Sequence, residues 1–296
     1  MSWEHNEAKN DLEKLQKSIA NTLRENNFSD TLKNSLRVTA HIPEIDYSKI
    51  FPRTQSEQIQ KLLSEMTQQH IGQVSKLVKT SLELIATSYP DNWRDGEYLS
   101  LPDNLDSLIA EGIPLAWTPP RDILEKIFLS ESPGNRRKIL SDNHKSIVRH
   151  GFTVLDSIDS YVLSEYVVFA KKSATAFECG HWEASQALST NLLDSLLYRI
   201  FDEQSRISIT SQKNPIDWKE ESVGIALVVG AISASYGEYW PKNGDKIPKK
   251  YSRNASTHGV SPMQYSKLNA LIALMHVVSL LKCTEIDLIK PEDKNI

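Results

Sequence analysis

The stretch LNALIALMHVVSLL, at residues 268–281, is apolar almost throughout. A helix that is apolar on all sides is buried inside a protein rather than lying on its surface. The stretch GIALVVGAISA, at residues 224–234, has the same character. Both are shorter than the run of about 20 apolar residues that crosses a bilayer, and they contain Gly, Asn or His. They therefore predict two buried helices and no membrane partner.

Two further helices are expected before these stretches. Helical patterns at 161–177 and 182–201 are separated by Gly180, and such a short break makes two helices antiparallel neighbours. Six residues of the second helix are expected to face inward: Ala184, Ala187, Leu188, Leu192, Leu196 and Ile200. The third and fourth helices are expected at 217–237 and 263–282. Together these four predict a helical bundle in the C-terminal half of the chain.

The N-terminal half also has helical periodicity. Apolar residues recur along one face between residues 59 and 85, and an earlier helix is expected at about 5–26. Residues 89–120 are instead rich in Pro, Gly, Asp and aromatic residues, which indicates an ordered junction. Trp93 and Trp117 are expected to anchor that junction.

Two shorter helices are expected between the junction and the bundle, at 119–129 and 134–149. Thr118 suits the cap position of the first helix, and Pro119 suits its first helical position. No strand is needed to account for any part of the chain. The expected fold class is therefore all-α.

Two domains are expected in this chain of 296 residues. The mainly helical region 1–155 is predicted to regulate the protein or to bind a protein partner, and 156–296 is predicted to form the bundle domain. The net charge of −4 gives the whole chain no general attraction for nucleic acid or anionic lipid. The N-terminus lacks the features of a signal peptide, and Cys179 and Cys283 do not suggest a disulfide scaffold. The expected compartment is the cytoplasm.

The polar sequence RNASTHG, which begins at Arg253, precedes the last helix. If it forms a helical turn that ends in a left-handed Gly259, Asn254 and His258 project from nearly the same face. The long side chain of Arg253 can reach the same cleft. An imidazole can transfer protons near neutral pH, a guanidinium can hold a phosphate, and an amide can orient the ring. This set suits phosphoryl transfer within RNA, where the 2′-hydroxyl lies beside its own phosphodiester.

The loop before this sequence is basic. Between Lys242 and Arg253, five basic residues and the single acid Asp245 give a local charge of +4. Such a patch can bind phosphates, and the alternative is a solvated loop. The residues expected to bind RNA are Lys246, Lys249, Lys250 and Tyr265. For the tyrosine the alternative is a structural role at the end of the bundle.

At these residues the sequence resembles the HEPN superfamily, whose motif is Arg, a polar residue, three further residues and His, often followed by Gly. RNASTHG matches this motif, although its Ala, Ser and Thr stand where larger apolar residues are common. The sequence FECGHWEASQALSTNLLDSLLYRIF, at 177–201, resembles the family's first helix hairpin. YSKLNALIALMHVVSLL, at 265–281, is similar to the apolar helix after the family's motif. The resemblance covers the C-terminal half.

The resemblance implies an HEPN-like bundle with metal-independent endoribonuclease activity, which leaves a 2′,3′-cyclic phosphate and a 5′-hydroxyl. His258 would act as general base or acid at the 2′-oxygen, Arg253 would stabilise the phosphate, and Asn254 would orient the site. The family also implies a homodimer through the bundle and a toxin or anti-phage defence role. The expected partner is RNA, with no DNA, metal or cofactor. Two alternatives are a non-catalytic helical interaction module and a stabilising or antitoxin partner of a nucleotidyltransferase.

The remaining polar candidates have structural interpretations. His276 lies in the apolar last helix and is expected to be a core or interface histidine. Cys179 and His181 have no second pair at ligand spacing, so no zinc site is expected. Three acids are expected to be solvated at the surface, and the alternative for each is a hydrogen bond across the bundle: Glu178, Glu183 and Asp194. No motif of nucleotide hydrolysis, zinc proteolysis or esterase chemistry occurs.

Overall fold

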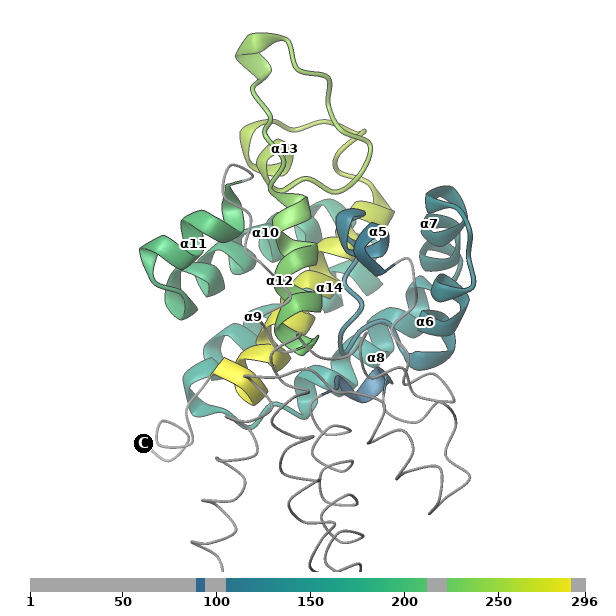
Figure 1. Cartoon of the computed structure of the whole chain (residues 1–296), viewed down its shortest axis with the longest axis vertical. Helices are drawn as coiled ribbons and strands as arrows, with labels where there is room; N and C mark the ends of the chain where they lie inside the picture. The colour runs from purple at the N-terminus through teal and green to yellow at the C-terminus, as the bar shows by residue number, and fades with distance from the viewer. Residues whose placement is uncertain (1–88, 94–104, 212–222, 289–296) are drawn as a thin grey trace, which may run out of the picture. The chain divides into compact units, whose positions relative to one another are not determined.

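The computed structural model describes residues 89–93, 105–211 and 223–288. Over these ranges the chain is helical and without strands, so the all-α prediction is confirmed. Figure 1 shows the α-helices, which are α5 (Leu105–Ala110), α6 (Arg121–Phe128), α7 (Pro133–Asp142), α8 (His144–Asp156), α9 (Ser164–Glu178), α10 (Trp182–Ile200), α11 (Glu203–Thr210), α12 (Val223–Ser235), α13 (Arg253–His258) and α14 (Lys267–Cys283). Short 3₁₀ segments are η2 (Asp91–Trp93), η3 (Tyr161–Leu163) and η5 (Pro241–Asn243), and the π-helical η6 (Thr284–Leu288) follows α14.

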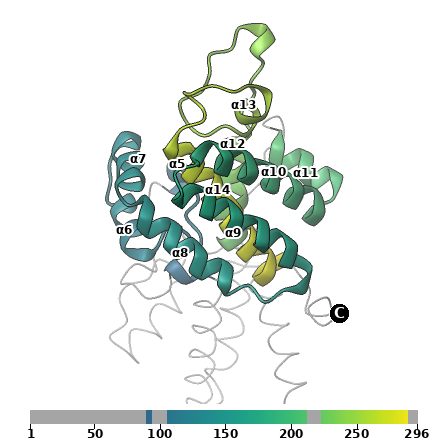
Figure 2. The same ribbon diagram turned by 180° about the vertical axis from the view of Figure 1, so that it is seen from behind.

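Helix α14 is the centre of the described fold. Every residue from Asn269 to Cys283 is buried, because a helix that is apolar on all sides needs neighbours on all sides. Helices α8, α9, α10 and α12 pack against it. Figure 1 shows α12 in front of α14, and Figure 2, from behind, shows α8 and α9 across its other side. The four expected bundle helices are thus present as α9, α10, α12 and α14, and α8 is a fifth helix packed with them.

Helices α9 and α10 form the expected hairpin. Gly180 lies in the break between them with φ +85°, a left-handed value that glycine adopts at little cost. The two helices pack along each other over their length. The break predicted at Gly180 is therefore confirmed.

The buried face of α10 differs from the expected one in its first half. Ala184 is exposed, whereas four polar residues are buried: Ser185, Gln186, Ser189 and Thr190. The hydroxyl of Ser173 on α9 donates to the carbonyl of Ser185 at 2.9 Å. The same hydroxyl lies 2.7 Å from the hydroxyl of Ser189. Because these hydroxyls are paired with one another, small polar side chains can occupy the contact between the helices. The buried face that apolar periodicity predicts is therefore wrong for the first half of α10.

Helices α5 to α8 belong to the same packing unit as the bundle. Helix α8 packs against α9 and α14, and α5 packs against α12. All of the described residues fall in one compact unit. Helix α8 ends near the expected boundary at residue 155 and packs against α14. That boundary therefore does not divide the described part of the chain.

The helices before the bundle begin at other residues than expected. The second expected helix is divided at Asn143 into α7 and α8, and Ser132 caps α7 by accepting the backbone N–H of Asn135 at 3.2 Å. Helix α6 begins only after Pro120. The reason is that Pro119 precedes another proline, and a residue in that position is disfavoured from helical backbone.

Two tryptophans anchor the junction before α6, as expected. Trp93 and Trp117 are both buried, and the indole N–H of Trp93 donates to the carbonyl of Leu115 at 2.9 Å. The amide of Asn92 donates to the carbonyls of Leu115 and Pro119 at 2.9 and 2.8 Å. Its oxygen accepts the backbone N–H of Trp117 at 2.7 Å.

Several expectations fall outside the described residues. These are the helices expected at 5–26 and 59–85, and the first residues of the helix expected at 217–237. In the ranges that are described, every helix is too short or too polar to cross a membrane.

Candidate active site

The sequence RNASTHG folds as helix α13, as its pattern predicts. Ser252 caps the helix, since its hydroxyl accepts the backbone N–H of Ala255 at 3.2 Å. Helix α13 packs against α10 at one end of the bundle (Figure 1). Gly259 ends the helix with φ −171°, which is extended backbone open to any residue. The expectation of a left-handed Gly259 is therefore wrong.

Gln264 holds the basic loop and α13 in place. Its side chain is fully buried, and its Oε1 accepts the backbone N–H of Ser252 at 3.0 Å. Its Nε2 donates to the carbonyls of Pro248 and Lys250 at 3.0 and 3.2 Å. The backbone that leads into Arg253 is thus fixed by one buried amide, and buried polar groups that are fully paired favour a single conformation.

Ser256 attaches the middle of α13 to the bundle. Its hydroxyl accepts Nε2 of the buried Gln186 on α10 at 2.9 Å. Its carbonyl accepts the hydroxyl of Tyr265 at 2.6 Å. Tyr265, which was expected among the RNA-binding residues, is half-buried and has this structural contact in the described chain.

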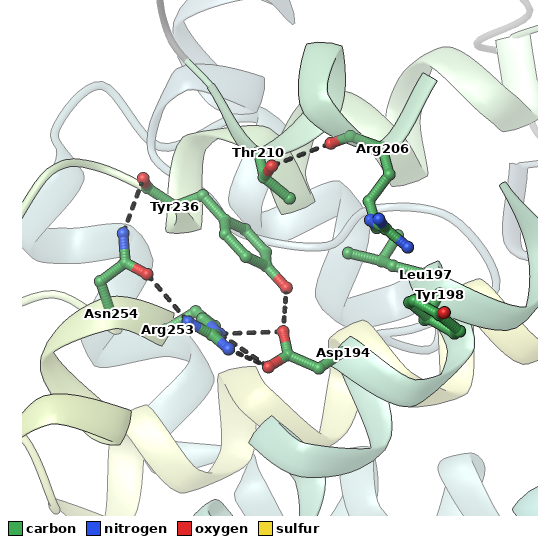
Figure 3. Close-up of a pocket in the computed structure, with 8 residues that line it drawn as sticks. All are labelled: Asp194, Leu197, Tyr198, Arg206, Thr210, Tyr236, Arg253 and Asn254. Carbon is green, nitrogen blue, oxygen red and sulfur yellow. Dashed lines mark hydrogen bonds and ion pairs between the residues drawn. The ribbon is translucent and has the colours of Figure 1, made fainter. Parts of the chain in front are cut away.

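Arg253 points toward α10 and forms an ion pair with Asp194 (Figure 3). Its Nε lies 2.8 and 3.0 Å from the two carboxylate oxygens, and its Nη2 bonds the second. The hydroxyl of Tyr236, just after α12, donates to the same carboxylate, and its ring centre lies 5.5 Å from the guanidinium. Burial disfavours the charge of Arg253, but Asp194 outweighs that effect and raises the pKa of Arg253. Burial and the charge of Asp194 raise the pKa of Tyr236, so the phenol stays protonated.

Asn254 orients the arginine rather than the histidine. Its Oδ1 accepts from Nη1 of Arg253 at 3.1 Å. Its Nδ2 donates to the carbonyl of Tyr236 at 3.1 Å (Figure 3) and to the carbonyl of Gly237, also at 3.1 Å. Within the described chain, Asn254 therefore orients the guanidinium of Arg253.

A cavity of about 390 Å³ opens beside the ion pair. It is lined by Asp194, Leu197, Tyr198, Arg206, Thr210, Tyr236, Arg253 and Asn254 (Figure 3). Two of the three expected catalytic residues thus share one cavity. Arg206 enters from α11, a helix that the sequence analysis did not include. Asp202 starts that helix by accepting the backbone N–H of Ser205 at 2.8 Å.

His258 is exposed in the last turn of α13 and does not line this cavity. It lies five positions after Arg253, which places the two about 140° apart around a helix axis. The long side chain of Arg253 was expected to close that angle, but Asp194 holds it against α10. The single chain therefore brings Arg253 and Asn254 together and leaves His258 outside.

The lysines of the basic loop are exposed next to α13. Lys246, Lys249 and Lys250 pair with no acid among the described residues. Asn269 of α14 donates to the carbonyl of Lys249 at 3.3 Å, so backbone contacts hold the loop while the ammonium groups face solvent. Figure 1 shows this segment extending beyond the end of the bundle beside α13.

The expected role of His276 is confirmed, and that of Asp194 is not. His276 is a core histidine as predicted: it is buried and its Nε2 donates to the carbonyl of Gly112 at 3.1 Å. Burial lowers the pKa of His276 to about 3. For Asp194 the expected solvation is wrong and the alternative, hydrogen bonding across the bundle, is confirmed, because Arg253 and Tyr236 both bind it. In the ranges described, no three His, Cys, Asp or Glu side chains gather as metal ligands.

Comparisons with protein-family models, with curated proteins and with solved structures found no match to this chain. The resemblance to the HEPN superfamily therefore stays a prediction that rests on the residues themselves.

Six of the eight residues that line the cavity were not among the expected site residues, and three of these six are Asp194, Tyr236 and Arg206. Asp194 lies in the apolar stretch NLLDSLL at 191–197, and a lone acid in such a stretch needs a partner, which was a usable signal. Tyr236 and Arg206 carry no comparable signal. Their roles depend on where α11 packs against α10 and α12, and on the hydrogen bond by which Tyr236, just after α12, reaches Asp194 of α10.

Proposed function

We propose that this chain is a metal-independent endoribonuclease of the HEPN type, with a toxin or anti-phage defence role. The observation that carries the proposal is the position of Arg253 and Asn254 in the wall of a cavity, on a helix that directly follows the exposed Lys249 and Lys250. These two lysines, which pair with no acid among the described residues, form a local electropositive site beside Arg253 in a chain whose net charge is −4. Such a site favours a polyanion such as RNA.

Arg253 stabilises the phosphate as it becomes pentacoordinate. A guanidinium has five N–H donors. The three that face Asp194 and Asn254 leave one free N–H on each Nη. Asp194, Tyr236 and Asn254 hold the group in place before substrate binds, and donors that are already oriented are the most effective in catalysis.

His258 transfers the proton at the 2′-oxygen, and it does so across a homodimer. Its exposed position outside the Arg253 cavity is accounted for if His258 of a second copy approaches that cavity. Val260 and Met263, one and four residues after the motif, are 91% and 49% exposed. Neighbouring exposed apolar side chains are typical of interaction surfaces. Dimerisation buries them and completes the site.

The test is RNA cleavage by the full chain in EDTA. Labelled single-stranded RNA is incubated with wild type, with His258→Ala and with His181→Ala, which removes an exposed histidine before α10 as a matched control. Wild type and His181→Ala should leave 2′,3′-cyclic phosphate ends, and His258→Ala should be slower by about a hundredfold or more. An RNA with 2′-deoxy nucleotides at the cleaved positions should stay intact. Cleavage that needs a metal, or that persists in His258→Ala, rejects the proposal.

A second function, a non-catalytic interaction module, is favoured by the ion pair of Arg253 with Asp194. In that case the arginine holds α13 on α10 and has no substrate. The protein is then a stabilising or antitoxin partner, for example of a nucleotidyltransferase. Wild type that is inert on varied RNAs and copurifies with such an enzyme supports this function and rejects the ribonuclease.

A further inference from the structure

Tyr198 and Arg206 line the side of the cavity opposite Arg253 and Asn254 of α13 (Figure 3). We propose that this pair binds one unpaired nucleotide of the RNA, with the phosphate on Arg206 and the base on Tyr198. The identity of the ligand as RNA rests on the proposed function. The assignment of these two residues rests on the contacts below.

Arg206 has a guanidinium that no acid neutralises within the described chain. Two acids lie one helical turn before it: Asp202 accepts the backbone N–H of Ser205 and caps α11, and Glu203 is exposed and forms no ion pair with Arg206 in the described chain. Asp194, in the same cavity, is already bound by Arg253 and Tyr236. Arg206 is therefore the cation of this cavity whose charge remains available, and a guanidinium binds phosphate oxygens through paired N–H groups.

Tyr198 is an exposed aromatic residue directly beside that cation. The guanidinium carbon of Arg206 lies 4.6 Å from the centre of the Tyr198 ring. The side chain is nevertheless 73% exposed, so most of the ring surface is available to a ligand. An exposed ring does not stabilise the hydrophobic core. Unpaired bases stack on aromatic rings and on arginine side chains, and this pair offers both.

The dimensions of the cavity favour a single unpaired nucleotide. Its volume of about 390 Å³ lies near the lower end of the range of about 300–1,000 Å³ that is usual for small-ligand pockets. A duplex keeps its bases stacked on one another and cannot present one to Tyr198. The inferred ligand is therefore single-stranded.

The test measures binding without cleavage. A short fluorescein-labelled oligouridine is titrated, by fluorescence anisotropy, into full-length protein that carries His258→Ala. Three further changes are added singly: Arg206→Gln, Tyr198→Ala and Tyr198→Phe. The matched control is Arg199→Gln, which removes an exposed arginine of α10 that lies outside the cavity. Thermal unfolding followed by circular dichroism checks that each variant is folded.

Arg206→Gln and Tyr198→Ala should each weaken binding about tenfold. Tyr198→Phe and Arg199→Gln should bind like the parent. For Arg206→Gln the slope of log K against log salt should also fall by about 0.7, the value for one lost phosphate contact on a single strand. A self-complementary RNA duplex should bind more weakly than the oligouridine.

The outcomes separate this inference from the proposed function. Binding that depends on Arg206 and Tyr198, in a wild type that cleaves no RNA, supports the subsite and rejects the ribonuclease. Cleavage by wild type that is unaffected by these changes supports the ribonuclease and overturns the subsite. Equal losses in Arg206→Gln and Arg199→Gln overturn the subsite, since only general charge then matters. A parent protein that binds no oligouridine overturns it as well.

Discussion

Arg253 and Asp194 are 59 residues apart in the sequence, and the Nε of the arginine lies 2.8 Å from the carboxylate of the aspartate. Through this contact α10 determines the direction of the first side chain of α13. The same carboxylate binds the hydroxyl of Tyr236, which follows α12. One acid thus holds three segments of the chain together.

Replacing Asp194→Asn should lower the free energy of unfolding by about 2 kcal/mol, because it removes the charged acceptor of two hydrogen-bonding partners. Urea denaturation measures the change. Asp142→Asn, in an exposed pair with Lys138, is the control and should cost less than about 0.5 kcal/mol. Equal effects of the two changes would show that the Arg253 pair contributes no more than a surface pair.

Gln264→Ala should loosen the basic loop. The side chain bonds the backbone of Pro248, Lys250 and Ser252, so its loss leaves three backbone groups without their partner. The expected cost is about 2–4 kcal/mol of unfolding free energy, with faster amide exchange in the loop. Hydrogen exchange read by mass spectrometry checks this against Gln204→Ala, an exposed glutamine of α11. Unchanged exchange in the loop would contradict the role of Gln264.

His276 should make stability depend on pH. Burial lowers its pKa to about 3 in the folded chain, whereas the unfolded chain binds a proton near the ordinary value of about 6.5. Between these values the unfolded state binds more protons, so unfolding free energy is full above the unfolded pKa and decreases as pH falls. The slope approaches about 1.4 kcal/mol per pH unit. His276→Gln, which keeps an N–H donor, should reduce that slope in urea titrations, and an identical slope in both proteins would refute the assignment.

Removing the exposed lysines should weaken RNA binding in proportion to the charge lost. The double change Lys249→Ala with Lys250→Ala should lower the salt slope of binding by about 1.4, or about 0.7 for each single-strand phosphate contact. Anisotropy titrations over several salt concentrations give that slope. The control is Lys138→Ala with Lys145→Ala on α7 and α8, which changes the net charge equally. The same slope in both double variants would place the RNA elsewhere.

Val260→Glu should weaken the proposed homodimer by at least about tenfold, because an unpaired carboxylate is costly inside an interface. Val260 is 91% exposed in the single chain, so the fold itself should not change. Light scattering over a concentration series measures the dimer constant, and RNA cleavage should fall with it. Val168→Glu on α9, at a valine that is 50% exposed, is the control. Wild type that is monomeric at all concentrations would exclude the shared site.

Short-range sequence signals were sufficient to place much of the fold. Gly180 separates α9 from α10, and α14 is buried on all sides because it is apolar on all sides. His276 could be assigned to the core for the same reason. The motif helix was also predictable, since its residues lie within one turn or two of each other and need no distant partner to be recognised.

Only the packed chain determined which way the motif side chains point. Arg253 turns toward α10 because Asp194 lies there, and a partner 59 residues away cannot be read from local periodicity. The buried polar face of α10 and the Gln264 contacts depend in the same way on hydrogen bonds between distant segments. Sequence pattern reports the polarity and spacing of neighbours, whereas the direction of a polar side chain is set by whichever donor or acceptor the fold brings near it.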